Sequence, residues 1–206
     1  MAVAAVDFKK ELKQLYNISG ADVVIIDVPP MNFLMVDGAG NPNTTREFQE
    51  AVEILYGVSY ALKSRVKKAG LTNYVVMPLE GLWWTESMAE FDPEDKGKWK
   101  WTLMIMQPEF VTEEYFHEAA SEIGKKKDIH VLSKIRYERY SEGLSAQIMH
   151  IGPYNTEGPD VAKLHNFIIE NGYVFAGKHH EVYLSDPRRV KPEKIKTLIR
   201  QPIRLK

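Results

Sequence analysis

Residues 178–187 read Lys-His-His-Glu-Val-Tyr-Leu-Ser-Asp-Pro, a β-strand pattern with a carboxylate at its centre. Because successive side chains of a strand point to opposite faces, His179, Glu181 and Tyr183 share one face. The even-numbered side chains share the other face, and the apolar Val182 among them predicts that this second face meets the core. We therefore expect Glu181 to face a groove, beside an imidazole and a phenol. An acid with such neighbours is suited to binding a cation or to moving a proton.

A less specific interpretation of the same segment is an edge strand whose polar face simply meets water. In that case Glu181 is a solvated surface residue. The two interpretations differ in how strongly the Glu181 side chain is buried.

Composition limits the classes of protein to consider. The chain has 206 residues, of which 44% are hydrophobic and 27% are charged, and these values are typical of a globular protein. Its 27 basic and 28 acidic residues give a net charge of −1, so there is no overall electrostatic signal for nucleic-acid binding. The absence of cysteine excludes disulfides, thiolate catalysis and thiolate metal ligands. We expect a small-molecule ligand and no nucleic-acid partner.

The N-terminus gives no secretion signal. Its apolar stretch, residues 1–6, is followed at once by Asp7 and is too short for the hydrophobic region of a signal peptide. No apolar segment approaches the roughly 18 residues that a membrane span needs. The sequence therefore predicts a cytoplasmic protein without a membrane partner.

Hydrophobic periodicity and turn residues predict a chain of strands and helices. The predicted strands cover residues 22–27, 33–36, 74–79, 99–106, 135–140, 144–151, the segment around Glu181, and 195–203. The predicted helices run from a cap at 43–45 to about 69, from 111 to 127 and from about 159 to 170. Strands 135–140 and 144–151 are expected to form a hairpin around the turn at 141–143.

This order of elements predicts a duplication. Two units, each in the order strand, strand, helix, strand, strand, follow one another with a linker helix between them. We expect one α+β domain over residues 1–206, made of βαββ repeats at about 20–108 and about 130–206. The helix at about 111–127 joins them.

The tryptophans are clustered, since all four lie between positions 83 and 101. Trp99 and Trp101 are two residues apart in a predicted strand and therefore share a face. One interpretation is that this face packs on the helix layer. The other is that indoles wall a flat apolar pocket, with Trp84 and Trp101 as the preferred pair. Such walls suit a planar aromatic or lipophilic cationic ligand, through contacts worth roughly 0.5–2 kcal/mol each.

Tyrosines are the other aromatic candidates for a ligand site. Tyr137 and Tyr140 lie at odd spacing in one strand, so only one of them faces a groove, and we favour Tyr137. Tyr154 follows a Gly-Pro turn and is placed either over the groove mouth or as a lid on the core. His179 is the further ligand-contact candidate, because it shares the face of Glu181.

No metal or cofactor site is predicted. His179 and His180 are adjacent and point to opposite faces of a strand, so they cannot chelate one ion. The other histidines, His117, His130, His150 and His165, show no ligand spacing. The glycines of residues 37–41 lack the third glycine and the basic residue of a phosphate-binding loop.

Several motifs together resemble the GyrI-like small-molecule-binding family, also described as the SOUL or bacterial transcription-activator effector-binding superfamily. The resemblance covers nearly the whole chain. Its most specific elements are residues 33–38, the Pro-Leu-Glu-Gly-Leu-Trp-Trp segment at 78–84, the strand at 99–108, His-Ile-Gly-Pro-Tyr at 150–154 and, above all, His-Glu-Val-Tyr-Leu-Ser-Asp-Pro at 180–187.

This resemblance implies two βαββ units of the SHS2 type, related by a pseudo-twofold axis. It further implies antiparallel sheets that form a central groove, with the helices on the outer face. The acid matching Glu181 is expected at the floor of that groove, where it meets cationic or polar parts of bound drugs. Because no helix-turn-helix motif precedes the domain in this sequence, we expect a stand-alone member rather than a regulator.

The tryptophan-rich version of the motif resembles a subfamily that hydrolyses the cyclopropane ring of DNA-alkylating cyclopropanoid compounds. In that interpretation the protein is a detoxifying hydrolase, with Glu181 as general base and Tyr183 as its partner. The alternative is a non-catalytic protein that sequesters lipophilic or cationic drugs, with Glu181 as counter-charge. A gyrase-inhibitor-like protein contact has little support, because no compact docking patch stands out in the sequence.

Overall fold

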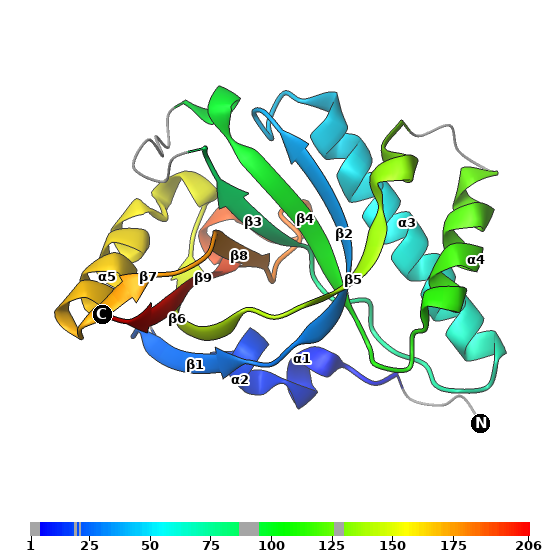
Figure 1. The fold of residues 1–206 in the computed structure, drawn as a ribbon, viewed down its shortest axis with the longest axis horizontal. Coiled ribbons are helices and arrows are strands. Elements are labelled where there is room, and N and C mark those ends of the chain that lie inside the picture. Colours follow the sequence, from blue (N-terminus) through cyan, green and yellow to red (C-terminus); the bar gives the residue numbers. More distant parts are fainter. Residues whose placement is uncertain (1–4, 19, 21, 87–94, 126–129) are drawn as a thin grey trace. The chain divides into compact units, whose positions relative to one another are not determined.

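The computed structural model describes residues 5–18, 20, 22–86, 95–125 and 130–206 (Figure 1). The chain divides into two compact units. Unit 1 comprises residues 1–8, 31–77 and 83–140, and unit 2 comprises residues 9–30, 78–82 and 141–206. Each unit therefore combines segments that are distant in the sequence. The division into repeats at about 20–108 and about 130–206 stays a prediction.

Unit 1 is built on three antiparallel strands and also contains the last residues of a fourth strand. Strand β2 (Met31–Ala39) pairs with β4 (Lys100–Gln107) on one side and with β5 (Arg136–Tyr140) on the other. The last residues of β3 (Glu80–Trp84) lie beside β4. The helices of this unit are α3 (Arg46–Lys68) and α4 (Glu113–Gly124), with short 3-10 helices at Lys96–Lys98 and His130–Lys134.

Helix α3 forms because its apolar residues recur at helical spacing. Ala51, Leu55, Val58 and Leu62 are all fully buried and lie three or four residues apart, so they form one stripe that packs on the strands. Lysines in its last turn complement the helix dipole, and Gly70, with φ of +73°, follows its end.

Unit 2 has strand order β1-β6-β9-β8-β3. Its elements are β1 (Val24–Val28), β6 (Gly143–Ile151), β9 (Lys196–Leu205), β8 (His179–Tyr183) and the start of β3. The short strand β7 (Tyr173–Phe175) also pairs with β9. Helix α5 (Gly158–Glu170) and 3-10 helices at Tyr154–Thr156 and Pro192–Lys194 complete the unit, and the short helices α1 (Phe8–Glu11) and α2 (Lys13–Tyr16) precede β1.

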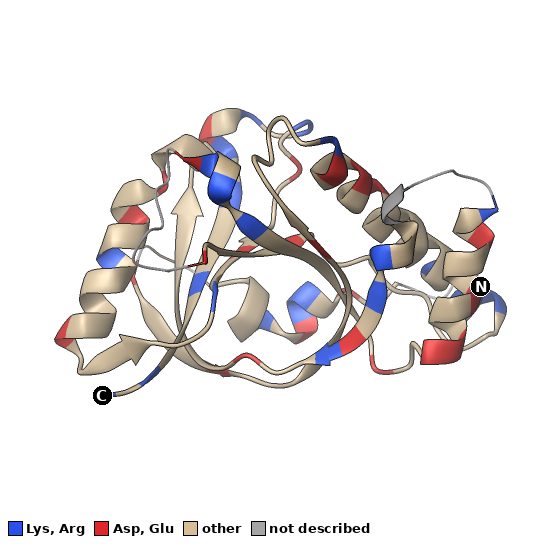
Figure 2. Ribbon diagram, turned by 45° about the horizontal axis from the view of Figure 1, so that its top comes forward, with Lys and Arg blue, Asp and Glu red and all other residues tan. Residues whose placement is uncertain are grey.

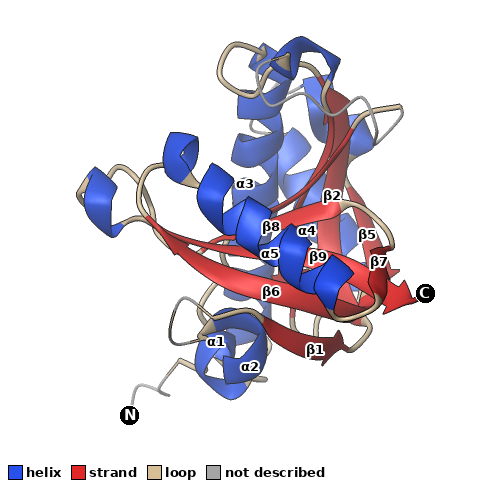
Figure 3. Cartoon of the chain, turned by 90° about the vertical axis from the view of Figure 1, so that its left-hand side faces the viewer, coloured by secondary structure: helices blue, strands red, loops and turns tan. Residues whose placement is uncertain are grey.

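The core of unit 2 lies between α5 and the strands that it crosses (Figure 3). Leu164 and Ile168 of α5 pack with residues of β6 and β9, among them Ile148 and Ile199, and all four are completely buried. Complete burial of one such aliphatic side chain stabilises the fold by roughly 1.5–3 kcal/mol. This contact fixes which face of the unit 2 strands is covered by α5.

The α+β class with antiparallel strands is confirmed. The predicted strand at 74–79 is wrong: only Tyr74 makes a bridge, to Val6, and strand β3 begins later, at Glu80. Pro78, which has no N–H to donate to a ladder, lies just before it. Strand β7 and helices α1 and α2 were not predicted. The last two residues of the predicted linker helix, 126 and 127, lie outside the described residues.

The predicted hairpin of residues 135–140 and 144–151 is also wrong. Both strands exist, as β5 and β6, but β5 pairs with β2 of unit 1, whereas β6 pairs with β1 and β9 of unit 2. The intervening residues therefore connect the two units instead of closing a two-strand turn. Gly143 begins β6, and the strand partners are set by non-local packing.

Charges are mixed along both units. In Figure 2, basic and acidic residues alternate over the helices and strands instead of gathering in one segment. This distribution agrees with the net charge of −1, and the described residues form no basic stripe. Among the described residues, every helix is too short or too polar to cross a bilayer.

Candidate functional site

Strand β8 places the predicted acid on the face of the unit 2 strands that α5 packs against. In the antiparallel register, Glu181 lies opposite Ile199, which in turn lies opposite Ile148. Directly paired residues share a face, and both isoleucines pack on α5. Glu181 therefore lies on the face that carries α5, whereas the resemblance placed the helices on the outer face, away from the groove. The alternation within β8 is confirmed, since His180 and Val182 are fully buried on the opposite face.

Glu181 is largely shielded from solvent. Its side chain is 13% exposed, and that of His179 is 12% exposed. The Nε2 atom of His179 lies 3.3 Å from Oε1 of Glu181. Strand β8 lies between β9 and β3, so the interpretation as a water-facing edge strand is wrong.

Two tyrosines lie next to the pair formed by Glu181 and His179. Tyr183 shares the face of Glu181, and its ring meets the ring of Tyr154 edge-on, with centroids 5.7 Å apart and an interplanar angle of 84°. Tyr154 is 38% exposed. Edge-to-face contacts of this kind are favourable because the positive edge of one ring meets the negative face of the other.

The turn that carries Tyr154 is anchored by a buried histidine. His150 Nδ1 lies 2.8 Å from Asp160 Oδ2 in α5, and its Nε2 lies 3.1 Å from the Pro153 carbonyl oxygen. The Thr156 hydroxyl donates to the same carbonyl at 2.7 Å. These bonds tie the end of β6 to the start of α5 and hold Tyr154 at the exposed end of the turn.

A second imidazole lies near His179. His165 of α5 packs edge-on against Phe175, with ring centroids 4.8 Å apart. Burial lowers the pKa of His165, and the nearby charge of His179 lowers it further. At neutral pH this side of the site therefore favours a neutral His165.

The remaining predicted ligand contacts belong to unit 1. Trp101 is completely buried and meets Phe48 of α3 edge-on, with centroids 5.2 Å apart. Its indole also lies over Gly38, where an added Cβ would be only 2.2 Å from Cη2 of Trp101. For Trp101, therefore, the interpretation that this face packs on a helix is confirmed.

Trp84 and Tyr137 are each half-buried. The Tyr137 hydroxyl donates to the Val111 carbonyl oxygen at 2.6 Å, and its ring stacks on Phe116 of α4. Trp84 ends β3. A role in ligand binding stays a prediction for both residues.

The structure brings together a buried ionic network that sequence reasoning missed. His180 Nε2 lies 3.0 Å from Glu80 Oε2, and His180 Nδ1 lies 2.8 Å from Glu142 Oε1. Arg200 donates from Nη1 to Glu142 Oε2 at 3.0 Å, and the Tyr16 hydroxyl donates to Glu80 Oε1 at 2.9 Å. We call these five residues the buried network. All five belong to unit 2.

The side chains of the four ionisable groups linked by ion pairs are at most 2% exposed. The carboxylates raise the pKa of His180 to about 9, against the opposing effect of burial, which is the largest single influence. Burial by itself raises the pKa of Glu142, but His180 and Arg200 together lower it to about 2. Burial next to Glu80 raises the pKa of Tyr16 well above its usual range.

Sequence signals for this network were weak. Glu80 begins strand β3, and Glu142 lies in the irregular segment before β6, positions where acids are usually solvated. A signal was present in Arg200, which interrupts an apolar strand on a face that also carries His180. Charged residues at buried strand positions need partners, but the sequence does not say which ones.

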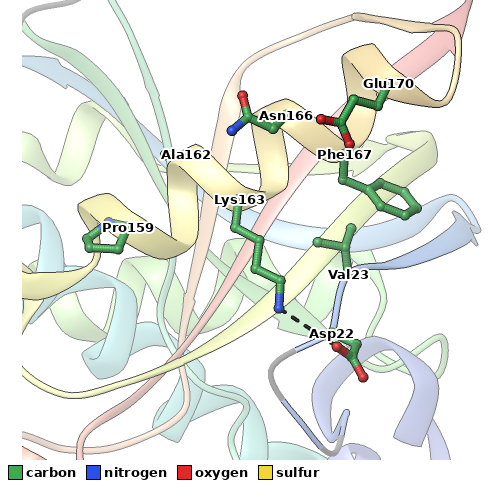
Figure 4. A pocket seen from close by; sticks show the side chains of 8 residues that line it. All are labelled: Asp22, Val23, Pro159, Ala162, Lys163, Asn166, Phe167 and Glu170. Atoms are coloured by element: carbon green, nitrogen blue, oxygen red, sulfur yellow. Dashed lines mark ion pairs between the residues drawn. The ribbon is translucent and has the colours of Figure 1, made fainter.

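One surface hollow of about 520 Å³ lies along α5 in unit 2 (Figure 4). Its lining residues are Asp22, Val23, Pro159, Ala162, Lys163, Asn166, Phe167 and Glu170. At its rim, Lys163 and Asp22 lie 3.7 Å apart, and the Asp22 side chain is 96% exposed. None of the predicted site residues lines it, and its charged groups face solvent, so we place no function there.

Within the described parts of the chain, no group of three or more acidic or histidine side chains is arranged to hold a metal ion. The two adjacent histidines of β8 use their ring nitrogens for different carboxylates, His179 for Glu181 and His180 for Glu80 and Glu142.

Comparisons with known proteins agree with this arrangement of elements. An uncharacterized conserved protein from Listeria innocua is 43% identical, with a TM-score of 0.90 over 97% of this chain and 100% of that chain. A hydrolase from the same organism is 41% identical, with a TM-score of 0.85 over 98% and 100% of the two chains. The EcmrR C-terminal domain, at 12% identity and a TM-score of 0.56 over 90% and 98%, shows likeness of fold alone. No curated protein matches.

The sequence also matches a protein family, described as the GyrI-like small molecule binding domain, over residues 21–204. The match spans both units. This chain belongs to the GyrI-like small-molecule-binding family.

Proposed function

We propose that the face of β8 that carries Glu181 and Tyr183 binds a planar or lipophilic small molecule and that Glu181 activates water against a cyclopropane ring of that molecule. The observation that carries this proposal is the pairing of the shielded Glu181 carboxylate with His179 at 3.3 Å, beside Tyr183. An acid that is held by one neighbour and shielded from bulk water can act as a base with fixed geometry.

His179 has a defined part in this scheme. When its Nε2 carries the proton, it donates to Oε1 of Glu181 and leaves Oε2 to accept a proton from water. The ring of Tyr154 packs edge-on against the ring of Tyr183 and so helps to hold the Tyr183 side chain in place. In this scheme Glu181 is the base, His179 is the donor that orients it, and Tyr183 supplies a phenol O–H.

The proposed reaction adds one water to a spirocyclopropyl dienone. Water attacks the cyclopropane methylene while Glu181 takes its proton, and the bond between the methylene and the spiro carbon breaks. The electron pair of that bond moves into the ring, which becomes aromatic, and the dienone oxygen gains negative charge. Tyr183 donates a hydrogen bond to that oxygen, which finally takes up the proton removed from water. The product is a phenol with a hydroxymethyl-type arm.

Two comparisons support the proposal. The family is one of small-molecule-binding domains, and a similar protein from Listeria innocua, 41% identical over the full length of that chain, is described as a hydrolase. The cyclopropanoid substrate class comes from the resemblance of the tryptophan-rich motif.

The test is incubation of the purified protein with a spirocyclopropyl dienone alkylator, followed by chromatography of the ring-opened product. Glu181→Gln keeps the shape of the side chain but removes the base, so we expect kcat to fall by about 10²-fold or more, with ligand affinity within a few fold. The matched control is Glu193→Gln, which changes an exposed acid of the same unit. Equal turnover by wild type and Glu181→Gln would remove the proposed base.

Sequestration without chemistry is the other function that this site supports. It predicts saturable binding of the alkylator and no product above the buffer rate. In that outcome Glu181→Gln weakens the binding of a lipophilic cation such as ethidium more than that of a neutral analogue, because only the cation needs the counter-charge.

A further inference from the structure

The imidazole of His180 is held from both sides by carboxylates. Its two ring nitrogens lie 2.8 Å from Glu142 and 3.0 Å from Glu80. A neutral imidazole has a single N–H, so one carboxylate would face a lone pair in a site without solvent. Only the imidazolium donates to both. The geometry by itself therefore favours a histidine that is charged at neutral pH.

The charges around His180 are balanced. Glu80 of β3 and Glu142 before β6 supply two negative charges, while His180 and Arg200 of β9 supply two positive ones. Among the described residues, the further polar contacts of these groups are neutral: the Tyr16 hydroxyl donates to Glu80, and Arg200 donates to the Gln147 side chain and to the Leu15 carbonyl oxygen. Paired and fully hydrogen-bonded in this way, the charges are tolerated inside the core.

The buried network also joins distant segments at one point of a short strand. Strand β8 has five residues, and His180 is the single residue of it that contacts both Glu80 and Glu142. Its side chain lies on the face opposite to that of the adjacent Glu181. The backbone position fixed by His180 on one face therefore sets the direction in which the Glu181 carboxylate points on the other.

We propose that His180 is a positioning residue for Glu181: as an imidazolium clamped between Glu80 and Glu142, it holds β8 so that the acid on the opposite face keeps its working geometry. This inference rests on the proposed function for the role of Glu181. The charge state of His180 and the constraint on β8 can be measured without any substrate.

The first experiment measures the charge state directly. The ring nitrogens of ¹⁵N-histidine-labelled wild type are followed by NMR between pH 6 and 10, with His180→Gln used to assign the signal. We expect both nitrogens to be protonated at pH 7 and to titrate only near pH 9. A neutral His180 tautomer at pH 7 would overturn the proposal.

The second experiment measures the constraint on β8. Amide hydrogen-exchange protection factors of Glu181 and Val182 should fall at least tenfold between pH 8 and pH 10, as the imidazolium is lost. Those of the buried α3 residues in unit 1 should stay constant. Equal changes in β8 and α3, or no change in either, would contradict a local clamp.

The third experiment separates positioning from simple stability. A network-free variant replaces all five residues: Tyr16→Phe, Glu80→Leu, Glu142→Leu, His180→Leu and Arg200→Met. Because no buried charge is left unpaired, this variant is expected to fold, as checked by circular dichroism and cooperative unfolding. The control is His117→Gln, which changes an exposed histidine of unit 1.

For ring opening, the kcat/KM of wild type should fall as the pH rises above about 9, and the kcat/KM of the network-free variant should show no such fall. Its kcat should be at least tenfold lower than that of wild type at pH 7.5, with KM changed less than threefold. A folded network-free variant with wild-type kcat and pH profile would refute the positioning role. If wild type shows no turnover but the first two experiments succeed, the proposed reaction fails while the clamp stands.

Discussion

The imidazole of His180 lies 3.0 Å from the carboxylate of Glu80, a residue one hundred positions earlier in the chain, and both side chains are almost completely buried. This contact links β8, which carries the proposed base, to the start of β3 within unit 2. It also makes a charged pair part of the core. The stability and the pH dependence of the protein should both report on it.

Removal of His180 alone should be strongly destabilising. In His180→Leu, two buried carboxylates lose their shared donor, and breaking a buried pair in this way costs about 3–5 kcal/mol of unfolding free energy. Urea unfolding followed by circular dichroism measures the change. His117→Gln, at an exposed position of α4, should change the same quantity by less than about 0.5 kcal/mol. A loss below about 1 kcal/mol for His180→Leu would show that the buried network is not stabilised by this imidazole.

Stability should depend on pH on both sides of neutrality. The pKa of His180 is raised from 6.5 to about 9 in the folded protein, so its contribution is complete below about pH 6.5 and is lost as the pH rises through 9. The pKa of Glu142 is lowered from 4.5 to about 2, so its contribution is complete above about pH 4.5 and is lost as the pH falls towards 2.

The contribution of the buried network to the free energy of unfolding should therefore be greatest between about pH 4.5 and pH 6.5. The loss on the alkaline side is on the order of 3 kcal/mol. It is measured as the difference in unfolding free energy between wild type and the network-free variant from pH 5 to pH 10. A difference that does not change over this pH range would contradict the assignment of His180.

Gly38 should not tolerate a side chain. It lies opposite Trp101 in the β2–β4 pair, and a Cβ at this position would be 2.2 Å from the indole. Gly38→Ala is therefore expected to force the fully buried Trp101 to move, at a cost of about 1–3 kcal/mol. Urea unfolding measures the loss, and near-ultraviolet circular dichroism reports the displaced indole.

The matched control is Gly158→Ala, at the first position of α5, where a Cβ meets no atom within 4 Å. It should be neutral or stabilising by up to about 1 kcal/mol. If both alanine variants behaved alike, the close approach of Gly38 and Trp101 would not be important for stability.

Tyr183 should affect turnover more than binding. Tyr183→Phe keeps the ring that meets Tyr154 but removes the proposed donor to the dienone oxygen, so kcat should fall by about 10–10²-fold with KM nearly unchanged. Steady-state kinetics of ring opening measure both constants. Tyr60→Phe, at an exposed position of α3, should leave them unaltered. A rise in KM with constant kcat would instead assign Tyr183 to ligand binding.

Local patterns in the sequence identified the elements well. Strand β8 and helix α3 were predicted because alternation and three-to-four-residue spacing are properties of neighbouring residues. The strand at 74–79 failed because an apolar run satisfies the strand pattern whether or not the fold supplies a full partner strand, and here only Tyr74 forms a bridge. The hairpin after Ile135 failed for the same reason, since pairing partners are chosen by the whole fold.

The candidate site was predicted in part. The shared face of His179, Glu181 and Tyr183 follows from strand geometry alone, and the structure shows it. Trp101 was assigned to a ligand wall because aromatic residues serve cores and pockets equally well, and only its packing on Phe48 and Gly38 decides between them.

The sequence by itself determined that β8 is a strand with Glu181 on one face and His180 on the other, because the two-residue period of a strand needs no tertiary information. Only the tertiary structure decided what each face meets. The pairing of Glu181 with Ile199 places the acid on the side of α5, and the burial of Glu80, Glu142 and Arg200 around His180 makes its imidazole a charged clamp. A charge can be kept in a core only where partners arrive from elsewhere in the chain, and folding alone brings them there.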